Sequence, residues 1–86
     1  MYDEYVTKDL GISAMLIASG HLMQRMFWKD RIAFFVFNDN DTCNRLSHLF
    51  LFGQVMVSAK AYYEAIKTLK IEIAKGINLN DNKERR

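Results

Sequence analysis

Proline is absent from this 86-residue chain, and cysteine occurs only once, at Cys43. A lone cysteine cannot form a disulfide within one molecule, so the composition indicates a fold without disulfides and favours a reducing compartment. Without proline, the breaks between secondary-structure elements must come from Gly, Asn and Asp. The longest apolar runs, residues 14–18 and 49–52, fall far short of the ~20 residues that a membrane span needs. We therefore expect no membrane partner.

The first five residues, Met-Tyr-Asp-Glu-Tyr, form an acidic segment without the apolar stretch of a signal peptide. Together with the lone cysteine, this predicts a cytoplasmic protein, located in the host cytoplasm or in the virion if the chain is viral. Half of the residues are hydrophobic and 13% are aromatic, which is enough for a core and argues against disorder. A chain this short forms one domain at most.

Motifs of catalysis and cofactor binding are missing as well. A metal site would need His21, His48 and Cys43 to converge, but Cys43 and His48 do not share one face of a helix at their spacing. Cys43 falls on an apolar stripe with Leu46, which indicates a packed core residue rather than a nucleophile. The glycines are isolated from one another, so no phosphate-binding loop is expected. We expect no enzyme activity, no catalytic or metal-binding residues, no cofactor and no small-molecule substrate.

Apolar residues recur at helical spacing in separate segments of the chain. We expect helices at residues 8–19, 42–52 and 59–75. Each is preceded by a side chain that can accept a hydrogen bond from the first turn. These capping residues are Thr7, Asp39 or Asp41, and Ser58. Each is followed by a glycine, as is typical of helix ends; these are Gly20, Gly53 and Gly76.

Between the first two helices the hydrophobic period changes from helical to alternating. Residues 21–28 and 31–37 are therefore expected to form two antiparallel strands joined by a short turn at Lys29-Asp30. The second strand is apolar on both of its faces. Either helices cover both faces, or one face meets another chain.

The predicted fold is α+β: an antiparallel β-hairpin packed with three helices. A third, short edge strand at residues 55–57 is an additional option, which gives the order α-β-β-α-(β)-α. Residues 1–76 are expected to form the single compact domain. Residues 77–86 are polar and are expected to be a frayed C-terminal tail.

Large apolar side chains gather on the expected hairpin and at the end of the second helix. The candidate partner-binding residues are Phe27, Trp28, Phe34, Val36, Leu51 and Phe52. A domain of this size has limited interior, so exposed members of this set would suit a protein partner or a second copy of the chain. The alternative is a dense core that covers all of them.

Basic side chains form a second candidate surface at the hairpin tip and on the last helix. They are Arg25, Lys29, Arg31, Lys60, Lys67 and Lys70. Arginine and lysine beside aromatic rings would suit phosphate contacts and base stacking. The net charge is only +2, and nucleic-acid-binding domains are usually far more basic, so a solvated helix face is the alternative.

Several short segments occur in a fixed order over about residues 5–75, and together they resemble a known family. They are Thr7-Lys8-Asp9-Leu10, Ser19-Gly20-His21, Phe35-x-Phe37, Val57-Ser58-Ala59 and Leu69-Lys70. This set resembles a small family of domains from bacteria and their viruses that has no established activity. The resemblance implies a compact helix–hairpin–helix–helix domain, often encoded in phage or mobile DNA, without catalysis. The chain departs from the family pattern at Phe34 and at Phe27-Trp28, where we expect a special contact.

From the residues and the resemblance together, we expect a small non-enzymatic protein-interaction module that docks through its aromatic hairpin. A virion component, a replication accessory and an inhibitor of host defence all fit this description. The alternative function is a small DNA- or RNA-binding accessory protein.

Overall fold

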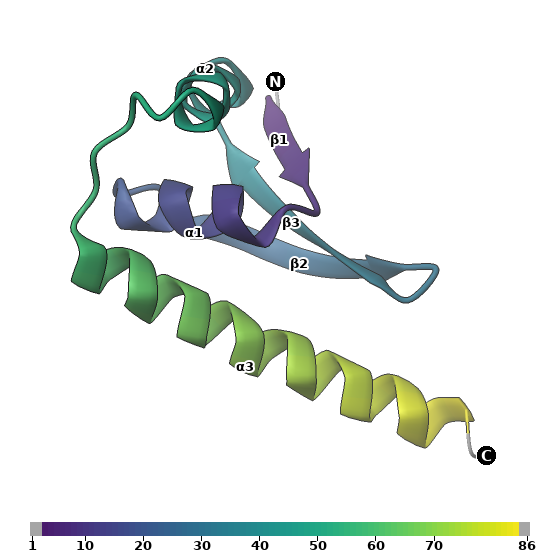
Figure 1. The fold of residues 1–86 in the computed structure, drawn as a ribbon. Coiled ribbons are helices and arrows are strands. Elements are labelled where there is room, and N and C mark those ends of the chain that lie inside the picture. The colour runs from purple at the N-terminus through teal and green to yellow at the C-terminus, as the bar shows by residue number, and fades with distance from the viewer. Residues whose placement is uncertain (1–2, 85–86) are drawn as a thin grey trace.

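The computed structural model describes residues 3–84, with side chains described for residues 3–77. Its elements are β1 (Glu4–Thr7), α1 (Leu10–Ala18), β2 (Met23–Lys29), β3 (Ile32–Asn38), α2 (Asn40–Leu51) and α3 (Ala59–Glu84). The predicted α+β class, with an antiparallel hairpin and three helices, is confirmed (Figure 1). The order is β-α-β-β-α-α.

The third strand lies at the N-terminus and not at residues 55–57, which belong to the linker between α2 and α3. β1 pairs antiparallel with β3, placing Tyr5 opposite Phe37 and Val6 opposite Val36. β2 pairs with the other side of β3, so the strand order is β1-β3-β2. The central position of β3 explains in part why both of its faces are apolar.

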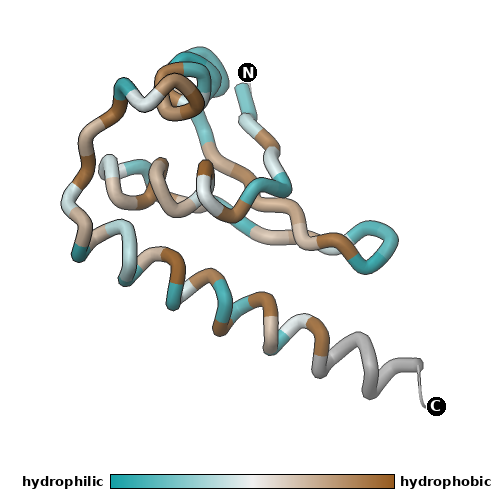
Figure 2. The backbone as a smooth tube through the Cα atoms, in the orientation of Figure 1, coloured by the Kyte–Doolittle hydropathy of each residue, from teal (hydrophilic) through white to brown (hydrophobic). Residues whose placement is uncertain are grey.

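The hairpin turn is Asp30-Arg31, one residue later than the predicted Lys29-Asp30. Asp30 has φ 52° and Arg31 has φ 67°. A two-residue loop with positive φ at both positions matches the twist of the strands that it joins. Figure 2 shows that the tip is hydrophilic and that a hydrophobic stretch of the hairpin lies next to it.

A capping side chain precedes the first turn of each of the three helices. For α1 the cap is Asp9, whose Oδ1 accepts from the Ile12 amide at 2.8 Å, and not the predicted Thr7. The Thr7 hydroxyl oxygen instead accepts from the Asp9 amide at 3.1 Å. Asp39 caps α2 and Ser58 caps α3, as the sequence indicates.

Gly20 and Gly53 end α1 and α2, as predicted, with φ 99° and φ 70°. After each helix, amides of the glycine and of the next residue bond back to carbonyls of the last turn. Gly76 does not end α3, which continues to Glu84 through most of the segment that the sequence indicates as a tail. Residues 85–86 of that segment lie outside the described residues.

The core lies between one face of the sheet and the helices. Phe35 and Phe37 of β3 are buried there with Met15 and Leu16 of α1 and Leu69 of α3. α1 is apolar around most of its circumference and is the most buried helix. Figure 1 shows α3 running along the length of the hairpin, and its C-terminal half lies near the hairpin tip.

Candidate interaction surface

The sheet has an inner face, which packs on the core, and an outer face. Tyr5, Met23, Met26 and Ala33 accompany Phe35 and Phe37 on the inner face. Alternation along each strand places the residues between them on the opposite side. We define the outer face by Glu4 and Val6 of β1, Arg25 and Phe27 of β2, and Phe34 and Val36 of β3.

Apolar side chains occupy the middle of the outer face. Phe27 and Phe34 stack across the hairpin with ring centroids 5.2 Å apart and an interplanar angle of 8°. Val6 remains 46% exposed and Phe27 37% exposed. Among the described residues, none of the apolar side chains of the outer face belongs to the core cluster or packs against it, although that cluster includes side chains from all three helices. The helices therefore leave these rings and Val6 accessible to another molecule.

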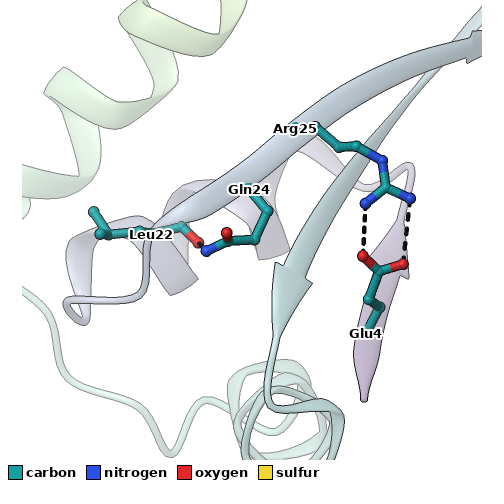
Figure 3. Close-up of polar contacts among 4 residues, drawn as sticks. All are labelled: Glu4, Leu22, Gln24 and Arg25. Carbon is teal, nitrogen blue, oxygen red and sulfur yellow. Dashed lines mark hydrogen bonds and ion pairs between the residues drawn. The ribbon is translucent and has the colours of Figure 1, made fainter. Parts of the chain in front are cut away.

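An ion pair crosses the same face. Arg25 of β2 reaches over β3 to Glu4 of β1, with nitrogen–oxygen distances of 2.6 Å and 3.2 Å (Figure 3). The hydrogen bonds from Arg25 hold the pKa of the Glu4 carboxyl below its ordinary value, and the same contact raises the pKa of Arg25. Val36 is fully buried although it faces away from the core, since Val6 and Arg25 flank it in register.

A β-bulge places Arg25 for this contact. The register of β2 shifts between Met23 and Arg25, so Gln24 is an extra residue in that strand. The Gln24 side-chain amide donates to the Leu22 carbonyl at 3.3 Å, as Figure 3 shows. Glu4, Gln24, Arg25 and Asn38 line a shallow open hollow at this end of the outer face.

The structure brings together only part of the predicted partner-binding set. Phe27, Phe34 and Val36 share the outer face, whereas Trp28 is half-buried on the inner side against α3. Leu51 and Phe52 are 68% and 77% exposed at the end of α2, apart from the strands of the outer face.

The predicted basic set is divided between opposite sides of the molecule. Arg25 lies on the outer face in its ion pair, and Lys29 and Arg31 are exposed at the hairpin end. Lys60, Lys67 and Lys70 are exposed on α3, on the side away from the core-facing Ala65 and Leu69. The Lys67 ammonium lies 5.3 Å from the Tyr63 ring centroid, so part of that surface is engaged within the helix.

Glu4 and Val6 are not among the residues predicted from the sequence, because β1 has only four residues and too short an alternating pattern to indicate a strand. The signal that was available is the Tyr-Val-Thr run at residues 5–7, whose residue types favour strands. The partnership of Glu4 with Arg25 follows only from the strand order, which no local pattern reveals.

The lone cysteine is part of the core. Cys43 is fully buried and its thiol donates to the Asn38 carbonyl at 3.3 Å. Burial, followed by the charge of Asp39, raises the pKa of this thiol. A catalytic cysteine needs the opposite shift, toward the thiolate.

Within residues 3–77, no three His, Cys, Asp or Glu side chains converge as metal ligands would. None of the helices in the described part of the chain has the length and apolar character to cross a bilayer. Comparison with protein-family models, with curated proteins and with solved structures gave no match.

Proposed function

We propose that this chain is a small non-enzymatic protein-interaction module whose binding surface is the outer face of the sheet. The observation that carries the proposal is the stacked Phe27–Phe34 pair beside Val6 on a face that lies outside the core cluster. Aromatic side chains, phenylalanine included, are enriched in protein interfaces relative to the rest of the surface.

The anchor is held in one arrangement before any partner arrives. Stacking fixes the Phe27 and Phe34 rings against each other, and both belong to paired strands. Binding then costs little side-chain entropy, because the side chains with the largest contact area are already ordered. The ion pair of Arg25 with Glu4 adds a polar border at one end, as interfaces commonly have.

The nucleic-acid alternative has less support in the arrangement of charges. A phosphate backbone needs several cations along one continuous surface. Here Arg25 already has a carboxylate partner, and the lysines of α3 lie on the other side of the molecule. Lys67 and Lys70 share their helix with the exposed Glu64, which further reduces the positive potential.

Photo-crosslinking in the cell of origin tests the proposal. Benzoylphenylalanine replaces Phe27 in one variant and the exposed Tyr63 of α3 in a matched control. We expect light-dependent adducts with protein, either a partner or a second copy, from position 27 and few from position 63. Equal yields from both positions, or no adduct from position 27, would overturn the proposal.

A further inference from the structure

A pocket lies on the inner side of the sheet, between the hairpin tip and the C-terminal half of α3. α1 has only nine residues and begins at Leu10, and Figure 1 shows that the hairpin and α3 both continue beyond this end of α1. The pocket has a volume of about 220 Å³, and residues of α1, β2, β3 and α3 line it. The short first helix therefore leaves the core unfilled at this end.

The walls of this pocket are apolar and already ordered. Four of the apolar residues that line it are Leu10, Ala33, Phe35 and Ile73. Each of them belongs to the core cluster or packs against it, so the walls exist before any ligand arrives. Trp28 also lines the pocket, with its indole against α3. Sites for small ligands commonly combine preformed apolar walls with a few polar groups.

The ionisable side chains of the lining are basic. They are Lys8 and Arg31, and because both are exposed they stand where the pocket meets solvent. Among the described residues that line the pocket, none is acidic. Lys8 forms no hydrogen bond or ion pair with another described side chain, and the adjacent Asp9 directs its carboxylate to the first turn of α1. The Lys8 ammonium is therefore available to an anion at this opening.

The volume restricts the ligand to about one ring with a short substituent. A cavity of about 150 Å³ holds benzene, and this pocket is roughly half as large again. The rings of Trp28 and Phe35 in its lining favour an aromatic body. A ligand of roughly ten non-hydrogen atoms in an open pocket binds in the high micromolar to millimolar range.

From this combination of shape and charge, we propose that the pocket binds a small aromatic carboxylate. The ring lies against the apolar walls, and the carboxylate meets Lys8 at the opening. The pocket and the outer face are on opposite sides of the sheet, so this inference goes beyond the proposed function and does not depend on it. The expectation of no small-molecule substrate rests on missing catalytic motifs, and a ligand that is bound without being transformed needs none of them.

Intrinsic fluorescence gives a direct test, because Trp28 is the only tryptophan of the chain and lines the pocket. Phenylacetate is titrated into the full chain at low ionic strength, and phenylacetamide, which has the same shape without the charge, is the matched control ligand. We expect a saturable change with both probes and an affinity about two- to fivefold higher for phenylacetate, as an exposed ion pair provides.

Variants separate the charge from the walls. Lys8→Met should lower the affinity for phenylacetate about two- to fivefold and leave that for phenylacetamide unchanged. Lys67→Met on α3, away from the pocket, is the control and should change neither affinity. Ala33→Leu fills the pocket and should abolish the binding of both probes.

If Ala33→Leu fails to fold, the side-chain methyl signals of the wild-type chain in NMR spectra replace it. Those of Leu10 and Ile73 should then shift with phenylacetate, while those of Val6 on the outer face stay unchanged. The absence of a saturable change, equal affinities for the two probes, or shifts centred on Val6 would overturn the proposal. An equal loss of both affinities in Lys8→Met would overturn it as well, because the ammonium would then not contact the carboxylate.

Discussion

The indole of Trp28 lies against α3 at Gly76, in the space that a side chain at this position would occupy. A Cβ added to Gly76 would come within 2.6 Å of Trp28 Cε2 and Cζ2. Glycine is therefore required here by the close approach of a strand residue, inside a helix that continues to Glu84. The contact holds the hairpin against the C-terminal half of α3 and leaves Phe27 on the opposite side of β2.

Gly76→Ala is expected to lower the free energy of unfolding by about 1–3 kcal/mol, because the indole must move. In an ordinary helix position the same change raises stability by about 1 kcal/mol. Urea denaturation followed by circular dichroism measures the difference. In a Trp28→Ala background the sign should reverse, and a loss of equal size in both backgrounds would show that the contact is not the cause.

The hairpin tip carries backbone strain at Asp30 and Arg31, both in the left-handed region. Arg31→Gly should raise the free energy of unfolding by about 1 kcal/mol, because glycine adopts positive φ without a steric cost. Arg31→Ala is the matched control, since it removes the same side chain and keeps the strain. Thermal melts of both variants separate the backbone effect from the side-chain effect. Equal melting temperatures would contradict this explanation.

Glu4 makes stability depend on pH through its pairing with Arg25. Its folded-state pKa is lowered, so its contribution is fully present above the ordinary glutamate pKa. That contribution is lost as the pH falls through the folded-state value. We expect the difference in melting temperature between wild type and Glu4→Gln to shrink as the pH falls below the ordinary glutamate range, and to shrink also in high salt. If the difference in melting temperature stays constant with pH, the ion pair does not contribute to the stability of the fold.

Cys43 should resist alkylation in the folded protein. Its side chain is fully buried and burial raises its thiol pKa, so both access and the thiolate fraction are small. Mass spectrometry after iodoacetamide treatment should show labelling only when urea unfolds the chain. Cys43→Ala should cost about 1 kcal/mol or more of stability through the cavity that it leaves. Rapid labelling under native conditions would contradict the buried position.

The segments with a strong period and local caps were predictable from the sequence. The helix ends at Gly20 and Gly53 and the caps at Asp39 and Ser58 follow from local backbone chemistry, and the structure confirms them. Gly76 also follows an apolar segment with helical spacing, as these glycines do. Glycine is required at this position, however, because of the contact with Trp28, 48 positions earlier.

The outer face was predictable only in part. Phe27 and Phe34 stand out as aromatic residues beside a turn, but the sequence leaves open whether helices or another chain cover the two apolar faces of residues 31–37. Glu4 and Val6 belong to a strand too short to recognise, and their positions depend on pairing with residues about thirty positions later. Trp28 and Phe27 are neighbours in β2, so their side chains point to opposite faces of the sheet. The packing of α3 decides which of the two faces is covered.

NMR amide spectra of the isotopically labelled chain give the most direct test of the outer face as the binding surface. The spectra are recorded at increasing concentrations of the chain, and again in extract of the cell of origin. We predict that the signals of Val6, Phe27 and Phe34 shift or broaden first, while those of Tyr63 and Lys67 on α3 stay unchanged. Changes centred on α3, or no change under either condition, would contradict the account.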